Sequence, residues 1–144
     1  MWRFSIVLGL ALIAPARAGD DRFATVKVTG VVQLPPGASY PAKVKIDIDI
    51  AKIEPGKVII FHKIIGRQEI RTIKSTPLPF AVSAPKSHLK DTPATSFTLR
   101  AKVYDLESGR PKLVFETPRD EAVQPFTEAG QAKQNVTLPV KALP

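Results

Sequence analysis

Cysteine is absent from the 144-residue chain. Its absence excludes disulfide bonds, thiolate metal sites, thiol nucleophiles and thiol redox exchange. It also excludes a protein that is held at a membrane by a lipid on its own cysteine. We therefore expect a soluble protein with no membrane anchor.

Catalytic signatures are also absent. The chain has no G-x-S-x-G, Walker, G-x-G-x-x-G or H-E-x-x-H sequence, which are the patterns of common hydrolases, nucleotide-binding proteins and metalloproteases. The two histidines, His62 and His88, lie far apart, and we expect structural roles for both. A zinc site needs three or four ligands, and only carboxylates occur at metal spacing. We expect no enzyme activity, no metal and no cofactor.

One pair of carboxylates needs a separate interpretation. Asp47-Ile48-Asp49 resembles the D-x-D of some metal-dependent transferases, and on a strand the two carboxylates point the same way, about 7 Å apart. Lys43 and Lys45 share that face, which indicates a solvated face whose charges pair across strands. A metal-dependent hydrolase or transferase remains the less favoured alternative, and it predicts metal-dependent stabilisation that is lost in Asp47→Asn.

Basic residues outnumber acidic ones, 21 against 13, and the net charge is +8. The net positive charge suits acidic partners such as lipid headgroups. The basic residues are scattered along the chain, however, which is more typical of an ordinary solvated surface. Stacking aromatics are few, with two tyrosines and seven phenylalanines. We therefore expect no nucleic-acid partner.

The first 18 residues have the three parts of a cleavable secretory signal. Arg3 supplies the positive charge, residues 6–14 form an apolar run, and Ala16-Arg17-Ala18 places small residues where a signal peptidase reads. The run is about half of the roughly 20 residues that span a bilayer. It therefore predicts export to the periplasm or secretion, with no transmembrane anchor.

The rest of the chain is patterned as short strands. Fourteen prolines leave little room for long helices, and alternation with a period of two dominates. Strands separated by turn signals argue for a β-sandwich or a small cracked barrel of about seven mostly antiparallel strands. We predict one all-β domain over residues 19–144, with strands at 25–34, 42–50, 57–66, 76–84, 95–105, 112–117 and 135–140.

The strand predicted at 57–66 is apolar on both faces. If Val58, Ile60 and Ile64 fill the core, the alternate residues face outward and need a cover, since burying each is worth about 1.5–3 kcal/mol. The cover is predicted to be the 67–76 segment or the 119–133 loop, with a partner as the alternative. The candidate partner-binding residues are Ile59, Phe61 and Ile65.

Several segments follow a pattern that is found in one family. They are Val28-Thr29-Gly30-Val31-Val32, Leu34-Pro35-Pro36-Gly37-Ala38, Pro79-Phe80, Leu113-Val114-Phe115 and Thr137-Leu138-Pro139-Val140. Together they resemble the YscW-type family, which contains pilotin-like chaperones of type III secretion and YbaY-like envelope lipoproteins. The likeness extends over most of the chain that follows the signal.

The resemblance implies a compact periplasmic β-sandwich or cracked barrel. Pilotin members of that family bind a hydrophobic secretin segment or a lipid in a groove. They typically carry a lipidated cysteine, so this cysteine-free chain could not pilot a partner by its own acyl chain. We expect a binding or chaperone-like protein for an envelope protein segment, apolar ligand or lipid. The alternative is a structural or stress-related envelope protein without a specific ligand, and the oligomeric state is left open.

The signal predicts a defined new N-terminus. When the full chain is expressed in a secreting host, we expect cleavage between Ala18 and Gly19. Intact-mass and N-terminal sequencing measurements on the exported protein check this. A product that retains residues 1–18 after export would contradict the prediction.

Overall fold

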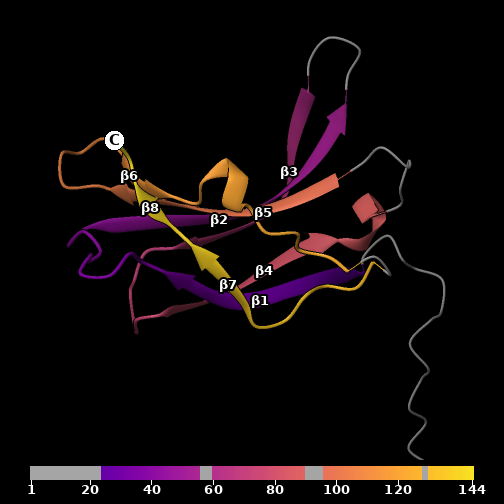
Figure 1. Ribbon diagram of the computed structural model, residues 1–144, viewed down its shortest axis with the longest axis horizontal. Coiled ribbons are helices and arrows are strands. Elements are labelled where there is room, and N and C mark those ends of the chain that lie inside the picture. The colour runs from indigo at the N-terminus through magenta and orange to yellow at the C-terminus, as the bar shows by residue number, and fades with distance from the viewer. Residues whose placement is uncertain (1–23, 56–59, 90–95, 128–129) are drawn as a thin grey trace, which may run out of the picture.

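Two packed sheets make up the part of the chain that the computed structural model describes, residues 24–55, 60–89, 96–127 and 130–144. Figure 1 shows the two layers. A three-stranded sheet has the order β4-β1-β7, and a five-stranded sheet has the order β3-β2-β5-β6-β8. The elements are β1 (Thr25–Gln33), β2 (Val44–Pro55), β3 (Ile60–Ile70), β4 (Leu78–Pro85), η1 (Lys86–Leu89), β5 (Ser96–Asp105), β6 (Lys112–Glu116), η2 (Arg119–Glu121), β7 (Val136–Pro139) and β8 (Lys141–Ala142).

The predicted β-sandwich is confirmed, and the sheets do not close into a barrel. All pairings are antiparallel except that of β1 with β7, which is parallel. The prolines Pro77 and Pro79 predict an edge position for their strand, and β4 is indeed an edge of the three-stranded sheet. No helix among the described residues is long and apolar enough to cross a membrane.

Alternating apolar residues meet between the two sheets and form the core. Most of the inward-facing residues of β2 and β5 are fully buried, as expected when side chains alternate between the two faces of a strand. The 119–133 stretch, which the sequence predicts as a loop, contributes Phe126, whose ring meets Phe97 edge-to-face at 5.2 Å. The fully buried apolar side chains of the core include Val28, Val32, Ile46, Ile48, Ile50, Leu99, Ala101, Val103 and Leu138.

A bulge in β3 changes which residues face the core. Ile50 of β2 pairs with Gly66, but the next residue, Ala51, pairs with Ile64, so Ile65 is an extra residue in the ladder. Ile65 is therefore buried in the core, with 8% of its surface exposed, and Ile64 is 48% exposed. The prediction that Ile64 points inward and Ile65 outward is wrong, because strict alternation takes no account of a bulge.

Two glycines allow strands to approach closely. A Cβ on Gly66 would lie 2.2 Å from the carbonyl oxygen of Ser83 on β4, and one on Gly30 would lie 2.0 Å from that of Val136 on β7. Neither distance is compatible with a side chain. Gly66 thus lets β3 lie against β4 along one edge of the sandwich, where Gln68 Oε1 also accepts a hydrogen bond from the Ala81 N–H at 2.9 Å.

The contact between β1 and β7 gives a test of the fold. We expect Gly30→Ala to lower the free energy of unfolding by about 1–3 kcal/mol, because β7 must move to admit the methyl group. Urea denaturation measures the change. Lys27→Ala, at an exposed position of the same strand, is the control and should change stability by less than about 0.5 kcal/mol. Equal stability of the two variants would show that β7 does not lie against Gly30.

Candidate binding site

A pocket of about 340 Å³ lies on the outer face of the five-stranded sheet, where η2 approaches β2, β3 and β5. Small side chains open it, because Ala51 and Thr98 stand opposite each other on β2 and β5 among longer neighbours. Ile64 and His62 alternate on one face of β3, and the bulge at Ile65 turns that face towards the pocket. The lining residues are Asp49, Ala51, Ile53, His62, Ile64, Thr98, Arg100, Lys102, Arg119 and Ala122.

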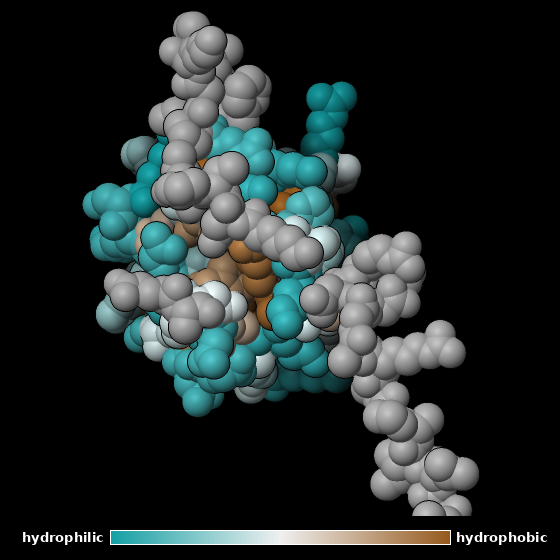
Figure 2. Space-filling model, turned by 90° about the vertical axis from the view of Figure 1, so that its right-hand side faces the viewer, coloured by the Kyte–Doolittle hydropathy of each residue, from teal (hydrophilic) through white to brown (hydrophobic). Residues whose placement is uncertain are grey.

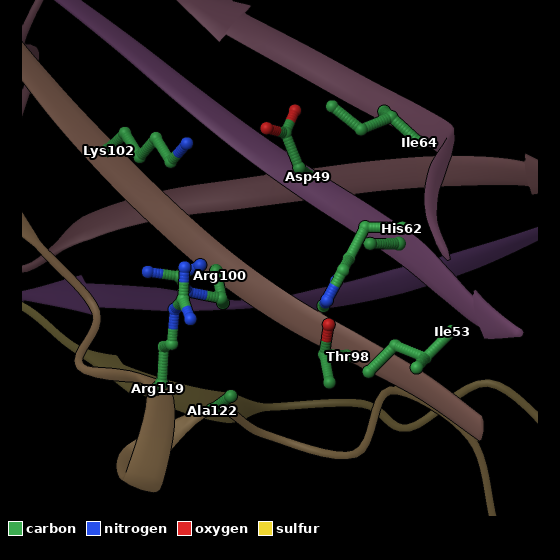
Figure 3. Close-up of a pocket in the computed structure, with 10 residues that line it drawn as sticks. Asp49, Ile53, His62, Ile64, Thr98, Arg100, Lys102, Arg119 and Ala122 are labelled. Atoms are coloured by element: carbon green, nitrogen blue, oxygen red, sulfur yellow. The ribbon is translucent and has the colours of Figure 1, made fainter. Parts of the chain in front are cut away.

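The pocket has a basic end and an apolar end. Figure 3 shows Arg100, Lys102 and Arg119 on one side, and Ile53 and Ile64 on the other. His62 lies between them and points towards Thr98. Such a mixture of apolar lining and a few placed polar groups is typical of ligand pockets, which are commonly about 300–1,000 Å³ in volume.

Among the described lining residues, Asp49 is the one carboxylate, and it is already bonded. Asp49 is 7% exposed and accepts two hydrogen bonds from Arg67 of β3, from Nε at 2.5 Å and from Nη2 at 3.0 Å. These bonds raise the pKa of Arg67. The pair is the planar, two-bond arrangement in which arginine holds a carboxylate most strongly. Asp49 therefore leaves the basic side chains of the pocket largely uncompensated.

The three basic side chains of the pocket are held to different degrees. Arg100 is fixed, because its Nε and Nη2 donate to the carbonyl oxygen of Thr117 at 3.2 and 3.1 Å, and Nη2 also reaches Glu116 Oε2 at 3.4 Å. Lys102 and Arg119 have neither a hydrogen bond nor an ion pair with any side chain that the structure describes. The basic end of the pocket can therefore accept an anionic group.

The aspartates of β2 are buried, contrary to the predicted solvated face. Asp47 is 4% exposed and Asp49 is 7% exposed, because β2 is an inner strand and longer side chains of β3 and β5 stand beside both. The predicted cross-strand pairing is confirmed for Asp49 and Arg67. Within the described ranges, no three His, Cys, Asp or Glu side chains are grouped to hold a metal ion.

A second cluster surrounds Asp47 further along β2. Lys45 Nζ lies 3.5 Å from Asp47 Oδ2 and 5.1 Å from the centre of the Tyr104 ring. Burial, and then the negative charge of Asp47, raises the pKa of the Tyr104 hydroxyl. Asp47 Oδ1 is buried with no hydrogen-bond partner among the described residues. Asp47 pairs in register with Lys102 of β5, so this cluster adjoins the basic end of the pocket.

Of the three sequence-predicted partner residues, Ile65 is the one whose side chain the structure describes. Ile59 and the side chain of Phe61 lie outside the described residues, and Ile65 belongs to the core. Ile64, which the alternation assigns to the core, lines the pocket instead. Arg100 and Lys102 stand on the polar side of a correctly predicted strand, but no sequence signal brings Arg119 to them from a distant loop.

Apolar surface is also visible at the end of the sandwich that faces the viewer in Figure 2, in a hollow ringed by polar side chains. Apolar areas with a polar rim mark recognition surfaces in many proteins. The pocket beside η2 is the better defined of the two candidates, because the described residues that line it include both its charged and its apolar side chains.

Comparison with known proteins shows the kind of fold. No protein-family model and no curated protein matches the sequence. Among solved structures, an alternative pilotin from the type II secretion system of Vibrio cholerae is similar, with a TM-score of 0.63 and 16% identity, over 84% of this chain and 99% of that chain. The fold is pilotin-like. The narrower resemblance to the YscW-type family remains a prediction.

The buried pair beside the pocket gives a second test. We expect Arg67→Ala to lower the free energy of unfolding by about 1–3 kcal/mol, because the buried Asp49 carboxylate loses its partner. Arg71→Ala is the matched control, since Arg71 pairs with Glu69 at exposed positions and its loss should change little. Thermal or urea unfolding of both variants measures the difference, and equal effects would contradict a structural role for the Asp49–Arg67 pair.

Proposed function

We propose that this protein is an exported, pilotin-like binding protein of the cell envelope, and that it holds a segment of another envelope protein without catalysing a reaction. The observation that carries the proposal is the pocket beside η2 on a pilotin-like fold. The predicted signal of residues 1–18 supports export. Without a cysteine, the protein would act in soluble form instead of through its own lipid.

Ile64 is the most informative residue of the pocket for this function. Among the described residues, the large hydrophobic side chains that are exposed are Ile64, at 48%, and Leu143, at 36%. Ile64 and Ile53 lie on the same side of the pocket, with His62 between them in Figure 3. A ligand that covers both side chains removes apolar surface from water and gains free energy in proportion to that area.

The outer face of the five-stranded sheet is suited to hold such a ligand. The pocket is built on paired strands, and the hydrogen bonds of Arg100 and Arg67 fix its polar wall. A site formed on strands needs little reorganisation, so less binding free energy is lost in ordering it. Its volume of about 340 Å³ is sufficient for one or two side chains of a polypeptide.

Capture from an envelope extract tests the proposal. We expect the full chain, carrying a C-terminal affinity tag, to retain an envelope polypeptide that Ile64→Asp retains at least about tenfold less well. A charge at this position must be desolvated against the ligand. Leu143→Asp is the control, because it introduces the same charge at an exposed apolar residue outside the pocket.

The retained polypeptide is identified by mass spectrometry and its affinity is then measured by calorimetry with the purified proteins. Circular dichroism confirms that both variants are folded. Equal retention by the two variants, or no retained polypeptide at several salt concentrations, would contradict the proposal. An enriched lipid in place of a polypeptide would contradict it as well.

A further inference from the structure

We propose that the pocket selects a carboxylate that stands next to an apolar side chain, so that the held segment presents a glutamate or aspartate to Arg100, Lys102 and Arg119. The inference deepens the proposed function and rests on it. It is carried by the charges and bonds of the basic end, by the apolar end opposite, and by the size of the pocket.

The charges at the basic end favour an incoming anion. Among the described residues, three basic side chains line the pocket together with one carboxylate, Asp49, and Arg67 already holds that carboxylate through two hydrogen bonds. Glu116 offsets part of the charge of Arg100 through a 3.4 Å contact. Lys102 and Arg119 form no ion pair within the described residues, although Lys102 lies in register with Asp47 and Glu116. Like charges that share a pocket repel each other, and a bound carboxylate offsets this repulsion.

The hydrogen-bond donors of the basic end match a carboxylate. Arg100 uses Nε and Nη2 on Thr117 and Glu116, and its Nη1 has no acceptor within the described residues. Arg119 offers the whole planar donor fork of its guanidinium, and Lys102 offers an ammonium group. Guanidinium groups bind carboxylates through paired, charge-assisted hydrogen bonds that are stronger than neutral ones. The fixed Arg100 would orient the ligand, and the other two would adjust to it.

The opposite end of the pocket defines what must adjoin the carboxylate. Ile53 and Ile64 lie across the pocket from the arginines, with Ala51 in the same lining. A bare anion would leave the apolar end of the pocket exposed to water. The volume of about 340 Å³ suits an acidic side chain with one apolar neighbour, whereas the acyl chains of a phospholipid are far too large for it. A polypeptide segment with an acidic residue beside a leucine or isoleucine meets both requirements.

A pair of blocked hexapeptides tests the inference against the full chain. One has a glutamate between two leucines and alanine elsewhere, and the other has glutamine in place of the glutamate. Titrations followed by nuclear magnetic resonance give the dissociation constants. We expect the glutamate peptide to bind about tenfold or more tightly than the glutamine peptide, because the charged hydrogen bonds are lost in the second. Added salt should weaken the glutamate peptide more.

Protein variants connect the preference to the pocket. We expect Lys102→Gln and Arg119→Gln each to abolish most of the difference between the two peptides. Lys112→Gln is the matched control, since it removes the same charge at an exposed position outside the pocket and should leave the difference intact. Both pocket variants retain the hydrogen bonds that the structure gives to Arg100 and Arg67, so we expect them to fold.

Several outcomes would overturn the inference. They are equal binding of the two peptides, no binding of either peptide, a preference that survives both pocket variants, and octanoate binding as tightly as the glutamate peptide. The proposed function is judged separately by the capture experiment with Ile64→Asp. A retained polypeptide together with any of these outcomes would therefore leave binding in place and remove only the selection for a carboxylate.

Discussion

Asp47 and Asp49 of β2 are almost completely buried, although they lie on the face of the sheet that is turned away from the core. Buried carboxylates are stable only where cations and donors replace their lost hydration. Arg67 of β3 supplies both for Asp49, whereas Lys45 of β2 pairs with one oxygen of Asp47 and the other has no partner among the described residues. These basic residues therefore stabilise the buried carboxylates of β2. The basic end of the pocket beside them comes from other residues, Arg100, Lys102 and Arg119.

The bulge in β3 connects this face with the apolar end of the pocket. By adding Ile65 to the ladder, it sends one isoleucine into the core and its neighbour Ile64 to the outer face. Gly66 follows at once and allows β3 to approach β4. The bulge and the glycine that follows it thus let β3 lie against β4 and place an exposed apolar side chain in the pocket.

Much of the fold was predictable from the sequence, because alternation with a period of two is read directly from residues such as those of β2 and β5. The edge position of β4 followed from its prolines. The faces to which Ile64 and Ile65 point were predicted wrongly. A bulge depends on how two strands pair, and the alternation within one strand does not show this. The burial of Asp47 and Asp49 was missed for a related reason, because it depends on which strands flank β2. The pocket was not predictable, since it needs Arg119 from a distant loop.

The outer face of the five-stranded sheet is the surface that we propose to receive a polypeptide. The most direct measurement is a map of backbone amide chemical shifts of the isotope-labelled full chain as the glutamate hexapeptide is added. We expect the largest changes around Ile64 on β3, Arg100 on β5 and Ala122 after η2, which line the pocket. Changes that centre on the three-stranded sheet of β4, β1 and β7, or no changes at saturating peptide, would contradict it.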